Sequence, residues 1–160
     1  MPPKYRLDRI DHAILAQLAK NARITNKDLA LLVGLSQSRT LERVRSLRQR
    51  GVIRGYHAEV DPAALGVGIQ AMVAIRLRRH SREAVAAFRA HALGLTETMA
   101  VYHVAGVNDF LIHVATRNAD HLRDFALDAF TTRAEVGHVE TILIFEAVRR
   151  GAMPDWELEG

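Results

Sequence analysis

One segment, residues 25–56, limits the possible folds of this chain more than any other, because its structural signals follow one another at short, fixed intervals. Thr25 is a favourable N-cap for a helix, and Gly34 can end that helix in a left-handed backbone conformation. Ser36 then caps a second helix, and the alternation from Val52 to Val60 predicts a small β-hairpin after it. Two helices joined so tightly, with a hairpin behind them, predict a winged helix-turn-helix.

Apolar residues at helical spacing define the faces that this unit would bury. A further helix is predicted before the segment, over residues 7–21, and Leu35 is expected to fill the turn. We expect the three helices to bury Leu7, Ile10, Ile14 and Leu18, then Leu29, Leu32 and Val33, and finally Leu41, Val44 and Leu47. On a helical wheel, the side of the third helix that faces away from this core carries Ser38, Arg39, Glu42, Arg43 and Ser46.

Charge is divided unevenly along the 160 residues. Residues 1–57 carry twelve lysines and arginines against four acids, a net charge of +8, although the whole chain carries only +4. The remaining residues therefore carry a net charge of −4. Such a split indicates that the first part of the chain meets a polyanion and the second does not. Since a basic helix-turn-helix is suited to a DNA groove, the pattern predicts binding to double-stranded DNA.

Individual roles in DNA binding follow from side-chain chemistry. Arg39 and Arg43 are the expected groove contacts, because arginine can bridge O6 and N7 of guanine, and Ser38 can reach a base or a phosphate. Glu42 repels phosphate, so it is expected to orient Arg39 or Arg45, or to accept a hydrogen bond from cytosine N4. The expected phosphate contacts, which supply affinity without selectivity, are Lys4, Arg6, Lys27, Arg45, Arg48 and Arg54. The alternative interpretation is an ordinary solvated basic helix.

The second half of the chain has the pattern of an α+β unit. The expected division is into residues 1–60, a hinge at 61–66, residues 67–150 and an acidic tail at 151–160. The predicted elements, in βαββαβ order, are residues 69–77, 81–92, 97–105, 110–116, 118–130 and 139–148. This order predicts a ferredoxin-like sandwich, with both helices on one face of an antiparallel sheet. Apolar runs at residues 71–75 and 142–145 predict a partner subunit over the other face.

The residues that carry these patterns resemble the Lrp/AsnC family of transcriptional regulators, the leucine-responsive or feast/famine group. The resemblance is strongest over residues 7–66, where the spacing from LDRID through GLS to GVIRGY matches the family, and it continues in AGVNDF at 105–110 and VETILIFEAVRR at 139–150. It implies a sequence-specific regulator that dimerises largely through its sheets and assembles further into tetramers or octamers. It also implies an amino acid or related metabolite bound between dimers.

The resemblance places that effector near the hairpin turn at Gly106. The family often has Gly-Asp-Tyr/Phe-Asp there, whereas this chain has GVND at residues 106–109. Asp109 can hold an ammonium group, backbone N–H groups around Gly106 can hold a carboxylate, and Thr141 aligns with a strand position near the family's site. The expected effector residues are therefore Gly106, Asn108, Asp109 and Thr141. The alternative is a plain hairpin turn, because Gly, Asn and Asp favour turns for local reasons.

Other classes of function have little support in the sequence. The absence of cysteine excludes disulfides, thiol catalysis and Cys-based zinc sites. His103 and His113 are expected on opposite faces of their hairpin, which argues against a shared metal ion, and no cofactor is expected. No phosphate loop, nucleophile elbow or membrane-length apolar run appears, so a cytoplasmic protein that is not an enzyme is expected. The alternatives are a sirohaem-decarboxylase-like enzyme and an architectural DNA binder of low specificity.

Overall fold

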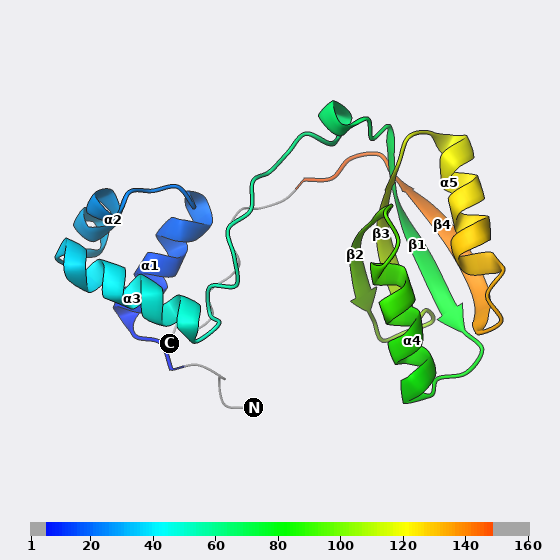
Figure 1. Cartoon of the computed structure of the whole chain (residues 1–160), viewed down its shortest axis with the longest axis horizontal. Helices are drawn as coiled ribbons and strands as arrows, with labels where there is room; N and C mark the ends of the chain where they lie inside the picture. The colour runs from blue at the N-terminus through cyan, green and yellow to red at the C-terminus, as the bar shows by residue number, and fades with distance from the viewer. Residues whose placement is uncertain (1–5, 149–160) are drawn as a thin grey trace. The chain divides into compact units, whose positions relative to one another are not determined.

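The computed structural model describes residues 6–148, and the chain divides into two compact units between Glu59 and Val60 (Figure 1). The first unit is helical, and the second is built on a four-stranded sheet, so the predicted α+β class is confirmed. The segment predicted to be a hinge contains a short 3₁₀ helix, Pro62–Leu65, whose N-cap Asp61 accepts a hydrogen bond from the Ala63 N–H. Residues 151–160, predicted to be an acidic tail, lie outside the described residues.

The first unit consists of three helices, α1 (Arg9–Lys20), α2 (Asn26–Val33) and α3 (Gln37–Gln49). Each begins at a side-chain cap, because the first N–H groups of a helix have no partner within it. Asp8 and Asp11 form a reciprocal capping box at α1, while Thr25 and Ser36 each accept a hydrogen bond from the third residue of their helix. Gly34 ends α2 at φ 68°, as predicted, in a conformation that favours glycine.

The core of the first unit is small and differs from the predicted one at two leucines. Ile14, Leu29 and Leu47 are buried, and partly buried apolar residues of all three helices pack against them. Leu32 and Leu41 are 60% and 38% exposed, so the prediction that they face inward is wrong. With so few buried side chains, each one contributes a large share of the stability of this unit.

A polar residue at a buried position explains why α3 is rotated about its axis relative to the prediction. Thr40 is fully buried, and its hydroxyl donates a hydrogen bond to the Ser36 carbonyl at 3.0 Å. Because that bond satisfies the hydroxyl within the helix, the side chain can enter the core without leaving a polar group unpaired. The inward side of α3 therefore centres on Thr40, Val44 and Leu47, and Leu41 lies at its edge.

The predicted β-hairpin wing is wrong. Residues 54–61 form no strand, and every one of them is exposed. The Val52 and Ile53 N–H groups both donate to the Leu47 carbonyl, at 2.9 and 3.2 Å, and these two side chains close the core behind α3. Beyond them the alternation of the sequence has no buried face to hold it, and a hairpin without such a face is marginal in water.

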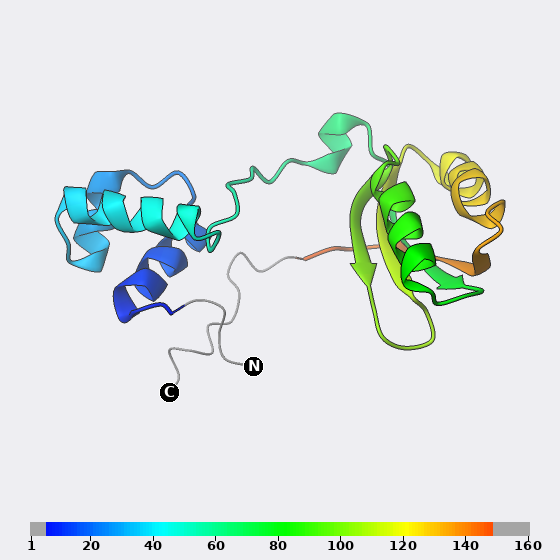
Figure 2. The ribbon, with the colours of Figure 1, turned by 60° about the horizontal axis from the view of Figure 1, so that its bottom comes forward.

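The second unit is an antiparallel sheet in the order β2-β3-β1-β4, with two helices on one face (Figure 2). Its strands are β1 (Ile69–Leu77), β2 (Thr98–His103), β3 (Phe110–Thr116) and β4 (Val136–Ile144). Its helices are α4 (Arg82–Leu93) and α5 (Ala119–Ala126), and α5 continues into a π-helical turn, Leu127–Thr131. β1 and β3 have the predicted bounds, whereas β4 begins three residues earlier than predicted and ends four residues earlier.

The core of the second unit lies between the sheet and its helices. Ile75 of β1 and Phe110 of β3 are fully buried against Phe88 of α4 and Phe130 of the π-helical turn. The Phe88 ring centroid lies 4.9 Å from that of Phe110 and 6.1 Å from that of Phe130, the spacing of favourable aromatic contacts. These contacts hold both helices to the same side of the sheet.

The opposite face of this sheet is apolar, and no element of residues 60–147 covers it. The strand register places Met72, Leu111, Ile142 and Tyr102 on this face, and the last two are each 47% exposed. At the end of β4, Phe145 is 97% exposed. The apolar runs predicted an open face of this kind.

The predicted faces of His103 and His113 assumed that Ala105 pairs with Phe110, and the observed β2–β3 register differs from that pairing by two residues. His103 lies opposite Phe110 instead of Ile112. Because side chains alternate with a period of two, a shift of two residues leaves each of them on its predicted face. The His103 ring stacks on Phe110 with centroids 4.9 Å apart, on the side of the helices, and His113 lies on the other side. The prediction that the two imidazoles lie on opposite faces is therefore confirmed.

Candidate nucleic-acid interface

Ser38, Glu42 and Arg45 form an exposed row on α3, opposite the buried side of that helix. They are spaced by four and three residues, so their side chains lie one above another on a single helical face. Arg39 is exposed at the edge of this row, and Gln49 extends it to the end of the helix. The row therefore presents hydroxyl, carboxylate and guanidinium groups to solvent from a helix whose other side is anchored in the core.

Polar contacts fix the beginning of α3, the part of a recognition helix that contacts base edges in other helix-turn-helix proteins. Ser36 caps the helix, and the Asn26 side-chain amide of α2 donates to the Gln37 carbonyl at 2.9 Å. The Ser38 hydroxyl lies 3.3 Å from the Ser36 hydroxyl and remains exposed. The first turn of α3 thus has a defined position relative to α2.

Arg43 does not point away from the core, so the prediction that it lies on the exposed side of α3 is wrong. Its Nη1 donates to Asp8 Oδ2 at 2.6 Å and to Asp11 Oδ1 at 2.9 Å, and the guanidinium bridges two carboxylates at the start of α1. The rotation of α3 that buries Thr40 brings Arg43 to this side. Asp11 is 7% exposed, so half of this bridge lies in the interior of the unit.

The bridge stabilises the charged forms of its members. The pKa of Asp8 lies below its ordinary value, chiefly because the Asp11 N–H donates to its carboxylate, and Arg43 lowers it further. Hydrogen bonds to Asp8 and then Asp11 raise the pKa of Arg43. Both Asp8 and Arg43 therefore stay ionised at neutral pH, where the bridge is intact.

A cationic groove lies at the C-terminal end of α3. Its volume is about 560 Å³, and it is lined by Arg45, Arg48, Gln49, Ile53, Arg54, Gly55 and Tyr56. The Arg48 guanidinium carbon lies 5.9 Å from the centre of the Tyr56 ring, within the range of a cation–π contact that holds the arginine in place. Three arginines without an acid in this lining suit a phosphate backbone.

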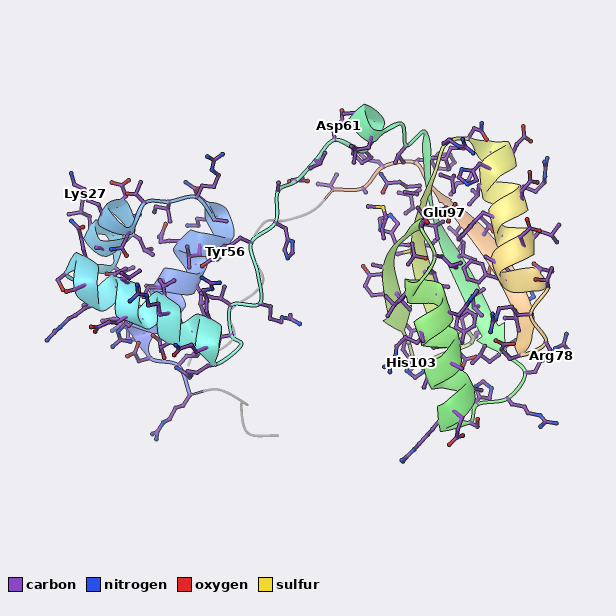
Figure 3. All side chains as sticks on the ribbon, viewed as in Figure 1. Lys27, Tyr56, Asp61, Arg78, Glu97 and His103 are labelled. Carbon is purple, nitrogen blue, oxygen red and sulfur yellow. The ribbon has the colours of Figure 1, made fainter. Side chains whose placement is uncertain are left out.

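The remaining predicted phosphate contacts lie outside this groove. Lys27 is exposed on α2 (Figure 3), and Arg6 is exposed just before α1. Lys4 lies outside the described residues. The structure thus brings Arg45, Arg48 and Arg54 together and leaves Lys27 and Arg6 as separate exposed charges.

The predicted effector residues do not meet within one copy of the second unit. Asp109 is largely buried: its Oδ2 accepts from the Leu77 N–H at 2.7 Å, and its Oδ1 lies 2.8 Å from His80 Nδ1. Asp109 therefore ties the hairpin turn to the end of β1. Gly106 has φ 137°, which explains the glycine by backbone conformation alone. Thr141 lies on β4, and β1 separates that strand from the hairpin.

Two other kinds of site find no support in the described part of the chain. Among residues 6–148, no three side chains of His, Asp or Glu lie close enough together to hold a metal ion. Within the same range, no helix is long and apolar enough to cross a membrane.

Two family models match this chain. Residues 70–154 match the Lrp/AsnC ligand binding domain, and residues 7–54 match a winged helix-turn-helix DNA-binding domain. The second match ends at residue 54, within the segment from Val52 to Val60 that was predicted to be a wing.

Relatives with similar sequences and solved structures with similar folds are transcriptional regulators of the same kind. The chain is 43% identical to the HTH-type transcriptional regulator AldR of Mycolicibacterium smegmatis, over 92% of this chain and 86% of that one. It is 35% identical to the leucine-responsive regulatory protein of Rhizobium meliloti, over 93% and 96%. A Neisseria meningitidis transcriptional regulator solved as an L-Met complex matches with a TM-score of 0.86 at 26% identity, over 96% and 99%. E. coli AsnC matches with a TM-score of 0.80 at 28% identity, over 91% and 97%.

Sequence reasoning missed three features of this surface. It did not identify Gln49 as the last member of the exposed row, because the helical wheel placed α3 in a different rotation. It did not anticipate Asn26 as a tie between α2 and α3. It also gave no role to Asp8 and Asp11, although two carboxylates three residues apart in a strongly basic segment were a signal of an ion pair.

Proposed function

This chain belongs to the Lrp/AsnC family of transcriptional regulators, and we propose that it reads its operator with the exposed row Ser38, Glu42 and Arg45 of α3, together with Arg39. The position of that row supports the proposal: it lies opposite the buried side of a helix fixed to both of its neighbours. In this arrangement α3 enters the major groove, where arginine discriminates guanine and a serine hydroxyl or a carboxylate completes the contact pattern.

The groove behind α3 supplies the phosphate contacts in this proposal. Arg48 and Arg54, together with Arg45, take the DNA backbone where it leaves the major groove, and the cation–π contact with Tyr56 restrains Arg48. Lys27, Arg6 and Lys4 add sequence-independent attraction to the DNA backbone. Arg43 is not among the proposed DNA contacts, because its guanidinium is occupied by Asp8 and Asp11.

We propose that two copies of the chain pair through the open faces of their sheets. The apolar side chains of that face, Met72, Leu111, Tyr102 and Ile142, are too extensive to be left in water without a penalty. A dimer also places two copies of α3 on one duplex, which requires a pseudo-palindromic operator.

We propose an amino acid or related metabolite as the effector. The support is the matched ligand-binding domain and the L-Met bound to the Neisseria meningitidis regulator. Gly106, Asn108 and Asp109 share the hairpin turn, but β1 separates Thr141 from them within one copy, so a pocket that joins all four would need more than one copy. A regulator that acts on DNA in the cytoplasm by such binding needs no catalytic step and no cofactor.

Binding of the full-length protein to duplexes provides the test. An electrophoretic shift with the region upstream of its own gene should give a complex that resists random competitor DNA at moderate salt. Arg39→Gln and Arg45→Gln should weaken that complex. Equal affinities for the upstream region and for random DNA across a salt series would indicate an architectural binder of low specificity. Such a result would contradict the proposal that the protein reads an operator.

A further inference from the structure

We propose that Asp8 and Asp11 are positioning residues for operator recognition. Through Arg43 they set the rotation of α3 about its axis, and so determine which side chains of that helix meet the bases. This inference rests on the proposed function, since it assumes that α3 reads DNA. It assigns a role in sequence selectivity to two acids that themselves touch no base.

The contacts that hold α3 are spread along its length. At its first turn, the Asn26 amide holds the Gln37 carbonyl at 2.9 Å. In its middle, the Arg43 guanidinium bridges Asp8 and Asp11 at 2.6 and 2.9 Å. At its end, Arg50 Nη2 donates to the Arg6 carbonyl at 2.7 Å. Arg50 Nη1 also lies 3.9 Å from Asp11 Oδ2. The Arg43 bridge is shorter and joins two carboxylates at the start of α1, so it is the main side-chain restraint on the rotation of α3.

Few buried apolar side chains of α3 resist a rotation of this helix about its axis. Leu47 is the fully buried apolar residue of this helix, and Val44 is only partly buried. Neighbouring residues of a helix are 100° apart, so a modest rotation moves Arg39 or Leu41 toward the place of Ser38 and Glu42. An ion pair on the flank of the helix resists that rotation, because Asp11 is buried and a carboxylate left there without a cation is costly.

Electrostatics and positioning predict opposite results when these carboxylates are neutralised. Residues 1–57 carry a net charge of +8, and each acid removed from them strengthens the attraction to a polyanion. By charge alone, Asp11→Asn should therefore bind any duplex more tightly. If Asp11 positions α3, the same substitution should weaken binding to the operator relative to random DNA. Asp8 still holds Arg43 at 2.6 Å in that variant, so Arg43 becomes free to meet phosphates only when both carboxylates are neutralised.

The experiment compares the full-length wild-type protein with Asp11→Asn, Asp8→Asn and the double variant that carries both substitutions. Asparagine is isosteric with aspartate and retains an oxygen for the capping box, so α1 keeps its cap. The probes are the duplex that the wild-type protein selects most strongly from a randomised pool and a scrambled version of it. Affinities are measured over a salt series, well below the unfolding temperature of each variant.

We expect the ratio of the two affinities to fall about tenfold in Asp11→Asn, an effect similar to that of losing one base contact. On scrambled DNA, the slope of log affinity against log salt should steepen by about 0.9 in the double variant Asp8→Asn/Asp11→Asn, because Arg43 is then free of both carboxylates and meets one more phosphate. Asp8→Asn should act in the same direction and more weakly, since the Asp8 side chain is 53% exposed. Arg43→Gln should lose the same selectivity without the steeper slope, and Arg43→Lys should retain part of it.

Asp28→Asn is the matched control. It removes one carboxylate from the same unit, and the asparagine oxygen can still accept from the Thr25 hydroxyl. Its selectivity should equal that of the wild type. A variant Asp11→Asn that unfolds at lower temperature but keeps full selectivity would show a purely structural role and would overturn the inference. Tighter binding without loss of selectivity would overturn it as well.

The design separates failure of this inference from failure of the proposed function. If the wild-type protein selects no duplex from the pool, operator reading fails and the positioning role fails with it. If the wild-type protein selects a duplex and Asp11→Asn prefers that duplex to the same degree, only the positioning role is contradicted.

Discussion

Leu47→Ala should unfold the helical unit while the sheet of the second unit stays folded. Leu47 is completely buried, with an exposed fraction of 0%, and it packs with Ile14 and Leu29 at the centre of α1, α2 and α3. Truncating a buried leucine to alanine typically costs about 3 kcal/mol, from lost transfer energy and the cavity that remains. A unit of this size has a total stability of only a few kcal/mol, so most of it would be lost.

Hydrogen exchange of the full-length protein measures this loss element by element. A cost of that size raises the equilibrium for opening on the order of 100-fold, so amides of α1 and α3 should exchange faster by that factor. Amides of β1 and β3, whose core is formed by Phe88, Phe110 and Phe130, should exchange at the wild-type rate. DNA binding should fall in parallel with the folded fraction of the first unit.

Leu32→Ala is the control, because the sequence pattern placed this residue in the core and the structure leaves it 60% exposed. It should change stability by less than about 0.5 kcal/mol. Equal acceleration of exchange in both variants would refute the described burial of Leu47 and exposure of Leu32. Faster exchange of β1 and β3 in Leu47→Ala would show that the two units do not unfold separately.

Three further predictions concern single residues. Gly34→Ala should destabilise the first unit by about 1–2 kcal/mol in urea denaturation, because alanine must adopt φ 68° there although its methyl group would meet no atom within 4 Å. Asp8 has a folded pKa below its ordinary value of 3.8, so it stabilises the fold above that pH and this contribution disappears as the pH falls through the folded pKa. The urea midpoint of Asp8→Asn should therefore depend less on pH in the acidic range than that of the wild type, and an identical dependence would contradict the hydrogen bonds assigned to Asp8. Asp109→Ala should cost about 1–3 kcal/mol, because it leaves the Leu77 N–H without its acceptor. Exchange of the Val104 and Asp109 amides should accelerate, and unchanged rates would show that Asp109 does not hold the turn.

Local signals explain why much of the fold could be predicted. The caps at Thr25, Ser36 and Ser81 act within three residues of themselves, so the helix beginnings were visible in the sequence. β1 and β3 are apolar runs bounded by turn residues, and both were predicted with their observed bounds. The uneven distribution of charge along the chain is likewise a property of the sequence, and it indicates which of the two units meets DNA.

Contacts between distant residues explain what could not be predicted. Arg43 pairs with residues 35 and 32 positions earlier, and no periodicity within α3 reports that contact. The burial of Thr40 depends on a hydrogen bond to the Ser36 carbonyl, which a wheel based on hydrophobicity ignores. The β2–β3 register depends on the hairpin turn, so its two-residue error was also beyond pattern alone.

The absence of cysteine from the sequence allows the central claim to be tested by site-specific labelling. Ser38→Cys places a thiol in the exposed row of α3, and Ala87→Cys places one on the exposed side of α4 as the control. The rate of maleimide labelling is measured for each full-length variant with and without a saturating duplex selected by the wild-type protein. The account predicts strong protection of the thiol at position 38 by DNA and none at position 87. Equal labelling at position 38 with and without bound duplex would contradict it.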